Sequence, residues 1–404
     1  MRPMSRLATA VVCLTQIWTA AWAQLALDGP VTEGAVLQRG VPITLSGRAT
    51  PGATVTVTLG QTRVQSLSAP DGRWSATLPA QATSAEPREL NIRTTEAELE
   101  IGDIRIGDVW IVAGQSNAAW PTQQDHLDNG RLRRAPMREG LRLYRQPPNC
   151  AKAPAPAAGE WRLSDWEGAK NFSALGYHFG AALADAAPTV PVGIIQAARG
   201  GSPLDAWLPP DALAVAPDAL RRRQVRVEAD RAARAAYPAR VRAWLERHGL
   251  NPQTAPPPPS FDAGDWVHVP GCYWDGMLES LADTPVAGVL WYQGETDATR
   301  GNTNYAGHLE AFLQVVRARW GGALPVVVIG LPPYAGQART PVIRAAQREV
   351  ASADPHTYFV PAEAPDHDVL ELHPRNKRDP ALRAAQALGL IDDSPPDSLP
   401  RSVR

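Results

Sequence analysis

The chain has 404 residues, of which 44% are hydrophobic and 20% charged. Such a mixture can bury a large core, which excludes disorder as a description of the whole chain. With 40 basic and 41 acidic side chains, the formal net charge is −1. No broad basic field therefore favours nucleic acid or an anionic membrane surface as a partner.

The N-terminus is typical of a secretory signal peptide. Arg2 and Arg6 precede an apolar run over residues 7–22, and the run ends in the small-x-small triplet Ala21-Trp22-Ala23. This layout predicts cleavage before Gln24 and export to the periplasm or the medium. The run is too short and polar to stay as a membrane anchor. We therefore expect residues 1–23 to be absent from an exported, unanchored protein.

The cysteines do not form a framework. Cys13 leaves with the predicted signal peptide, so Cys150 and Cys272 remain, either as free thiols or as one bridged pair in an oxidising compartment. The chain has no zinc-ligand spacing, phosphate loop or dinucleotide fingerprint. We expect neither a metal nor an organic cofactor.

Residues 24–106 show short alternating runs separated by turn residues. Runs such as Thr54-Val55-Thr56-Val57-Thr58 and Trp74-Ser75-Ala76-Thr77-Leu78 flank turns at Pro51-Gly52 and Asp71-Gly72. Period-two alternation with Gly turns predicts antiparallel strands. This part is predicted to be a small antiparallel β-sandwich.

From residue 107 the period changes, and apolar runs alternate with helical stretches up to about residue 395. The runs are 109–113, 141–144, 192–197, 286–291, 325–329 and 358–360, and the helical stretches include 174–186, 305–320, 342–353 and 379–390. Strands that alternate with helices predict a parallel sheet covered on both faces, with its site at the carboxyl ends of the strands. Residues 211–270 interrupt this rhythm as an arginine-rich, helical surface insertion. Residues 396–404 are predicted to be a disordered tail.

The first segment that could carry chemistry is Gly114-Gln115-Ser116-Asn117, at the end of a predicted buried strand. A serine at a strand end can act as a nucleophile, and its own N–H can point at a developing oxyanion. The same serine could instead be an ordinary helix N-cap.

Two further segments follow predicted strands. Gly200-Gly201 lets backbone N–H groups approach a substrate closely, although paired glycines also make plain turns. Gln293 could donate its amide N–H to the same oxyanion, and Trp291 beside it could line a sugar-sized pocket. The alternative there is a buried, satisfied amide with aromatic residues in the core.

The last segment ends in His373-Pro374, just before the final predicted helix, with several carboxylates upstream. An imidazole at that point could serve as a general base, or it could be a cap or surface residue.

Together these segments resemble the sialate O-acetylesterase group of the SGNH esterase superfamily, which includes carbohydrate acetylesterases. The resemblance starts in the sandwich and runs to the last helix. The family's motifs occur in the family's order: Gly-Asp-Val-Trp with Gly-Gln-Ser-Asn, Gly-Gly-Ser-Pro with Ala-Trp, Trp-Tyr-Gln-Gly-Glu, and His-Pro-Arg-Asn-Lys. The resemblance implies a three-layer α/β/α flavodoxin-like domain and an esterase that removes acetyl groups from carbohydrate.

By matching position, the resemblance implies that Ser116 is the nucleophile and His373 the general base and later acid. It implies an oxyanion hole made by the Ser116 N–H, by Gly200 or Gly201, and by Gln293. Residues expected to contact the substrate are Asn117, Arg199, Trp291 and Glu295.

The chain departs from the family's pattern at the third member of the triad. The family usually has Asp two residues before the histidine, whereas this chain has Glu371. We expect Glu371 to orient His373, with Asp368 or a dyad without an acid as alternatives. A non-catalytic carbohydrate-binding protein and a lipase or thioesterase on the same scaffold are the competing functions.

Overall fold

The computed structural model describes residues 25–125, 129–248, 267–363 and 367–392. The predicted signal peptide, the predicted tail and part of the predicted insertion lie outside these residues.

The N-terminal part is the predicted β-sandwich. One sheet has the order β1-β3-β6, and the other runs β5-β4-β7-β8 with β2 on the far side of β8. Paired strands are antiparallel except β2, which runs parallel to β8. Alternate side chains of β4 and β6 face the core, as the period-two pattern requires. The strands are β1 (Ala26–Leu27), β2 (Val36–Gln38), β3 (Ile43–Arg48), β4 (Thr54–Leu59), β5 (Thr62–Leu67), β6 (Arg73–Leu78) and β7 (Ser84–Arg93).

Strand β8 (Glu98–Gly114) belongs to both parts of the molecule. Its first half pairs with β7 in the sandwich, and its second half pairs with β11 and β12 in the large sheet. The predicted boundary between residues 106 and 107 therefore falls inside one continuous strand, which carries the chain from the sandwich directly to the candidate site.

The large sheet has the order β10-β9-β11-β8-β12-β13-β14. Its pairs are parallel except for the antiparallel pair of β10 and β9. Strands β11, β12 and β13 are buried at every position, because helices cover both faces of the sheet. The strands are β9 (Leu141–Arg145), β10 (Trp161–Leu163), β11 (Val192–Ala198), β12 (Gly288–Tyr292), β13 (Val326–Gly330) and β14 (Thr357–Pro361).

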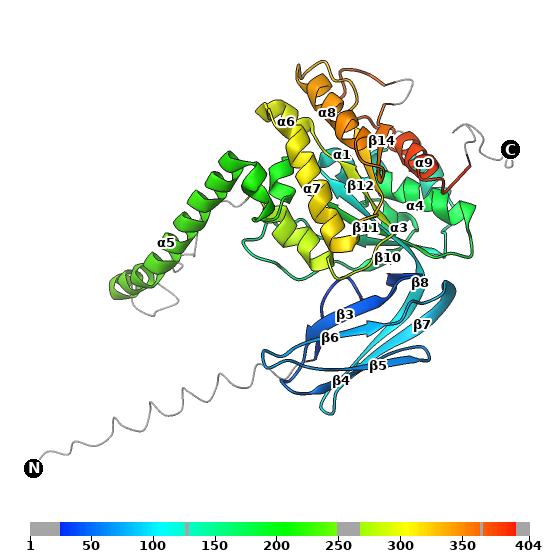
Figure 1. Cartoon of the computed structure of the whole chain (residues 1–404), viewed down its shortest axis with the longest axis vertical. Coiled ribbons are helices and arrows are strands. Elements are labelled where there is room, and N and C mark those ends of the chain that lie inside the picture. Colours follow the sequence, from blue (N-terminus) through cyan, green and yellow to red (C-terminus); the bar gives the residue numbers. More distant parts are fainter. Residues whose placement is uncertain (1–24, 126–128, 249–266, 364–366, 393–404) are drawn as a thin grey trace, which may run out of the picture.

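Helices form the outer layers, so the predicted three-layer α/β/α fold is confirmed. Helices α4 (Ala174–Ala186) and α9 (Arg378–Ala387) pack against each other, and so do α7 (Tyr305–Trp320) and α8 (Thr340–Ser352) (Figure 1). The shorter elements are α1 (Ser116–Ala119), η2 (Thr122–Gln124), α2 (Asn129–Arg134), α3 (Trp166–Ala169), η3 (Leu204–Trp207), η4 (Ala212–Val215), η5 (Trp274–Leu278), η6 (Glu279–Leu281) and α6 (Glu295–Arg300).

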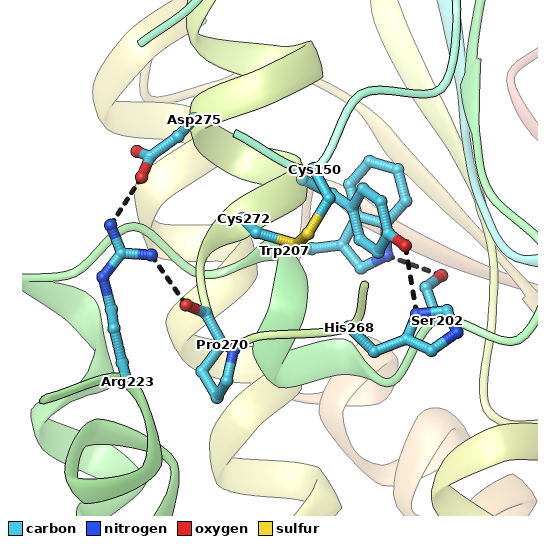
Figure 2. The surroundings of a disulfide bond; sticks show 9 residues. Cys150, Ser202, Trp207, Arg223, His268, Pro270, Cys272 and Asp275 are labelled. Carbon is cyan, nitrogen blue, oxygen red and sulfur yellow. Dashed lines mark hydrogen bonds and ion pairs between the residues drawn. A yellow bond between two sulfur atoms is a disulfide. The ribbon is translucent and has the colours of Figure 1, made fainter. Parts of the chain in front are cut away.

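The insertion contains the long helix α5 (Pro217–His248), which projects away from the sheet (Figure 1). Only Ala219, Arg223 and Asp230 of this helix are buried. Arg223 attaches it to the body of the domain by donating to Asp275 at 2.6 Å and to the carbonyl of Pro270 at 2.8 Å (Figure 2). Most of the other arginines of α5 are exposed to solvent.

The order of the strands reverses at β8. After β8 the chain adds β9, β10 and β11 on one side, and then crosses to add β12, β13 and β14 on the other. In open parallel sheets, ligands bind at the carboxyl ends of the strands where the order reverses. The carboxyl ends of β8, β11 and β12 are the positions of Ser116, Gly200 and Gln293.

Candidate active site

A glycine fixes the position of Ser116. Gly114, the last residue of β8, has a φ of 130°, and a Cβ atom there would lie 2.1 Å from the carbonyl oxygen of Tyr292. Only glycine lets β8 end so close to β12. The chain then turns into α1, whose first residue is Ser116. The N–H groups of a first helical turn have no acceptor within the helix, so the Ser116 N–H is not used by α1.

His373 lies against Ser116, although 257 positions separate the two residues. Its Nε2 atom is 2.8 Å from Ser116 Oγ. The ring stacks on Trp120, with centroids 5.3 Å apart and planes inclined by 20°. Burial, and then the nearby Lys377, lower the pKa of His373 below its ordinary value of 6.5. The imidazole is therefore neutral at neutral pH and can accept the Ser116 proton.

The carboxylate predicted to orient His373 is not in place in this structure. Glu371 is exposed, and among the described residues its carboxylate has no hydrogen bond to His373. The alternative acid, Asp368, accepts from the N–H of Leu370 at 2.9 Å, within its own turn. The backbone N–H of Glu371 also donates to the backbone carbonyl of Asp368 at 2.9 Å, within the same turn. An orienting role for either carboxylate has no support from the geometry.

The two glycines after β11 occupy different positions. A Cβ on Gly200 would lie 3.6 Å from the Ser116 Cβ, so this residue borders Ser116 directly. Gly201 has a φ of 74°, and a Cβ there would lie 3.3 Å from Nε2 of His268. In the described part of the chain, neither glycine N–H has a backbone acceptor. Both remain candidates for the oxyanion hole.

Gln293 is buried in a closed polar network. Its Nε2 donates to Asp297 at 2.5 Å, to the Ser202 carbonyl at 3.1 Å and to the Gln115 side chain at 3.2 Å. The Tyr305 hydroxyl donates to its Oε1 at 3.2 Å. Protein acceptors already surround this amide. The geometry therefore matches a buried, satisfied amide, which the sequence analysis gave as the alternative to an oxyanion donor. Its role as an oxyanion donor stays a prediction.

Three of the four residues predicted to contact the substrate are buried in this structure, and their substrate contacts stay predictions. Trp291 is fully buried and packs on Phe312, with ring centroids 4.1 Å apart. Asn117 is also fully buried, and Glu295 is 5% exposed. These side chains belong to the interior because the strand ends that carry them are covered on both faces. Arg199 is exposed, so its predicted substrate contact stays a prediction.

Lys377 lies at the site, although no role was predicted for it from the sequence. It is fully buried, and its Nζ donates to Asn117 Oδ1 at 2.6 Å and to the carbonyl of Pro374. Burial lowers the pKa of Lys377 from 10.5 to about 7. One signal could have drawn attention to it: only three of the 40 basic residues in this chain are lysines.

A disulfide lies beside the segment that faces Gly201. Cys150 and Cys272 are bridged, which settles the choice that the sequence left open (Figure 2). Tyr273 follows Cys272, and its hydroxyl hydrogen-bonds Nδ1 of His268 at 3.1 Å. The bridge thereby anchors the segment that holds His268 against the glycine turn.

In the ranges that the structure covers, no three His, Cys, Asp or Glu side chains gather where they could hold a metal ion. Within the same ranges, no helix is both long and apolar enough to cross a bilayer.

Comparison with known proteins places these features in a family. The family described as carbohydrate esterase, sialic acid-specific acetylesterase, matches residues 106–236 and 271–386. Residues 237–270, which lie between the matched segments, fall within the predicted insertion.

Individual relatives agree with this match. Sialate O-acetylesterase of Rattus norvegicus is 28% identical over 293 residues, which are 64% of this chain and 50% of that protein. The Homo sapiens protein of the same name is 25% identical over 277 residues, 64% of this chain and 45% of its own. This chain thus spans about half the length of these curated relatives. A crystal structure of a carbohydrate acetylesterase from Xanthomonas citri superposes with a TM-score of 0.72 at 27% identity, covering 90% of this chain and 74% of the other.

Proposed function

Because this chain belongs to the sialic acid-specific acetylesterase family of carbohydrate esterases, we propose that it removes O-acetyl groups from carbohydrate through an acetyl-enzyme on Ser116. The observation that carries the proposal is the 2.8 Å hydrogen bond between Ser116 Oγ and His373 Nε2. A serine hydroxyl held by a neutral imidazole at a strand end is the arrangement that acyl transfer requires.

In the first step, Ser116 Oγ attacks the acetyl carbonyl carbon while His373 Nε2 takes the serine proton. Charge develops on the carbonyl oxygen, and the N–H groups of Ser116 and of the Gly200-Gly201 turn are the donors available to it. The carbon–oxygen bond to the sugar then breaks. His373 gives its proton to the leaving sugar oxygen, and the acetyl group stays on Ser116.

In the second step, water attacks the acetyl-enzyme. His373 takes a proton from the water, and the returning Ser116 Oγ recovers that proton when acetate leaves. All of these proton transfers use Nε2 of His373, the atom that contacts Ser116 Oγ. No metal or organic cofactor takes part in this scheme.

The names of the relatives support an acetylated sugar as the substrate class. Two kinds fit those names: O-acetylated sialic acid and an acetylated polysaccharide such as xylan or xyloglucan.

We also propose that the protein acts outside the cytoplasm. The disulfide between Cys150 and Cys272 supports this location, since such bonds persist in oxidising compartments. The predicted signal peptide over residues 1–23 points the same way.

The test is acetate release by the purified protein from acetylated xylan, acetylated xyloglucan and O-acetylated sialic acid, with Ser116→Ala as the blank. Release that disappears in the variant would establish serine esterase activity, and the preferred substrate would identify the sugar class. A folded wild-type protein that releases no acetate but binds the sugars would favour a non-catalytic binding protein. Faster release of long acyl chains than of acetate would favour a lipase or thioesterase.

A further inference from the structure

The backbone on both sides of His373 is held by buried side chains. The carbonyl of Leu372, just before the histidine, accepts from Nδ2 of Asn117 at 3.1 Å. The carbonyl of Pro374, just after it, accepts from Nζ of Lys377. These contacts hold the segment that carries the imidazole at the peptide group just before His373 and at the second peptide group after it.

The two donors are also joined to each other. Nζ of Lys377 donates to Oδ1 of Asn117 at 2.6 Å, and both side chains are fully buried. Because Asn117 directly follows Ser116, one connected unit reaches from the nucleophile's helix to both neighbours of His373. We call Asn117 and Lys377 the backbone clamp.

The clamp lies among charged and aromatic groups from several elements. Asn117 also donates to Oε1 of Glu295, at the start of α6. Charges on Glu295, Asp125 and Glu371 favour the protonated form of Lys377, whereas burial disfavours it. Asp125 is itself hydrogen-bonded to His178 at 3.1 Å. The Lys377 Nζ lies 5.6 Å from the ring centroid of Trp120, which stacks on His373, and 5.4 Å from that of Tyr292.

A lysine suits this position better than an arginine would. An ammonium group is compact and can lose its proton when buried, whereas a guanidinium is larger and permanently charged. The other basic residues of the chain are arginines except Lys152 and Lys170. A lysine at this fully buried position therefore fits a need for one small donor that bridges Asn117 and the Pro374 carbonyl.

We propose that Asn117 and Lys377 are positioning residues that hold His373 against Ser116 through its backbone, in the place of an orienting carboxylate. The proposal rests on the esterase function proposed above. It accounts for the 2.8 Å contact between Nε2 and Ser116 Oγ in a structure where Glu371 makes no hydrogen bond to the imidazole. Both side chains of the clamp are fully buried, so its loss is expected to slow proton transfer and leave substrate binding unchanged.

The first test is Lys377→Met, which keeps the length and apolar character of the side chain but removes the donor. With p-nitrophenyl acetate as substrate, we expect kcat to fall about 100-fold with little change in KM, as a small misplacement of reacting groups causes. The pKa of the acid limb of kcat/KM should rise as well, because the Lys377 charge lowers the pKa of His373. The shift of that limb reports the loss of the Lys377 charge, whereas the fall in kcat at constant KM reports the loss of positioning. Lys170→Met is the matched control, since Lys170 pairs with Glu167 on the surface and should leave all three quantities unchanged.

Asn117→Ala removes the other half of the clamp and should give the same fall in kcat at constant KM. Thermal melting shows whether Lys377→Met folds. If it does not, Asn117→Ala alone tests whether the clamp positions His373. A folded variant at either position that keeps kcat within about threefold of the wild type would overturn the proposal.

Labelling with a fluorophosphonate probe separates this inference from the proposed function. The rate at which the probe modifies Ser116, followed by mass spectrometry, depends on activation of the serine and needs no sugar. A wild-type protein that is not labelled at Ser116 would count against the esterase function itself. A labelled wild type with equally fast labelling of Lys377→Met and Asn117→Ala would overturn only the clamp.

Discussion

The imidazole of His373 meets Ser116 with its Nε2 atom, 2.8 Å from Oγ, while its ring face stacks on Trp120. This contact joins the end of β8 to the loop before α9. The stacked indole shields one face of the base from water. Since burial disfavours the imidazolium, the pair is set up for proton abstraction at neutral pH.

The first prediction concerns the pH dependence of activity. The pKa of His373 is lowered below 6.5 by burial and by Lys377, and only the neutral imidazole can take the serine proton. The acid limb of kcat/KM should therefore lie below pH 6.5, and activity should persist into mildly acidic solution. A pH–rate profile with a soluble acetyl ester measures this limb. A limb at or above pH 6.5 would contradict the environment described for His373.

The second prediction concerns the pH dependence of stability. Lys377 has a pKa of about 7 in the folded protein against an ordinary value of 10.5. Between these values the unfolded chain binds more protons than the folded one, so this group's contribution to stability increases as the pH rises through that window. We expect the free energy of unfolding of the wild type, relative to Lys377→Met, to increase from pH 7 to pH 9. Urea unfolding of both proteins at each pH measures the difference, and a difference that stays constant would contradict the shift.

The third prediction concerns the carboxylates before His373. Glu371 is exposed, and Asp368 caps its own turn, so neither is placed to orient the imidazole. Both Glu371→Gln and Asp368→Asn should keep kcat within a few-fold of the wild type. Steady-state kinetics of the two variants at the pH optimum provide the measurement. A loss of tenfold or more in Glu371→Gln, with an unchanged melting temperature, would restore the acid expected from the family's pattern.

Much of the fold could be predicted because periodicity and turn residues report local structure directly. The ranges predicted for α4 and α7 match the structure at both ends, and the alternation of strand and helix correctly placed Ser116 at a strand end. Burial at the ends of these strands was harder to predict. Asn117, Glu295 and Trp291 follow or end strands in the same way as Ser116, but only the packed helices show that they face inward.

The supports of His373 could not be predicted for a related reason. Lys377 is a charged residue near the start of a helix, which in a sequence is typical of a solvated surface. Its burial depends on Asn117, which lies 260 positions away. The family's pattern instead directed attention to a carboxylate two residues before the histidine. Backbone hydrogen bonds of this kind leave no signature in a single sequence.

The fourth prediction concerns Gln293. In Gln293→Ala, the Ser202 carbonyl loses its donor, whereas Asp297 still accepts from Leu204 and Gln115 from Gly294 and Thr296. A buried group left unpaired costs about 1–3 kcal/mol. The melting temperature should therefore fall. If Gln293 also donates to the oxyanion, kcat should fall by a further factor on the order of 100 to 1,000 at nearly constant KM.

Gln347→Ala is the matched control for Gln293. Gln347 is also fully buried, donates to the Gln293 carbonyl at 2.8 Å and accepts from the N–H of Leu331 at 3.0 Å. Gln347→Ala should lower the free energy of unfolding by about as much as Gln293→Ala does. If both variants lose kcat equally after correction for the folded fraction, Gln293 acts only through the buried network.

The fifth prediction concerns the Cys150–Cys272 bridge, which spans 122 positions of the chain. Closing so long a loop restricts the unfolded state, so removing the bridge should destabilise the protein by up to about 5 kcal/mol. We expect urea unfolding to shift to lower denaturant when the wild type is reduced, whereas Cys150→Ala/Cys272→Ala should not respond to the reductant. Titration of thiols in the unfolded, unreduced protein checks the bridge itself. Reactive thiols at Cys150 and Cys272 would show that the bond does not form, and would remove the support it gives to a location outside the cytoplasm.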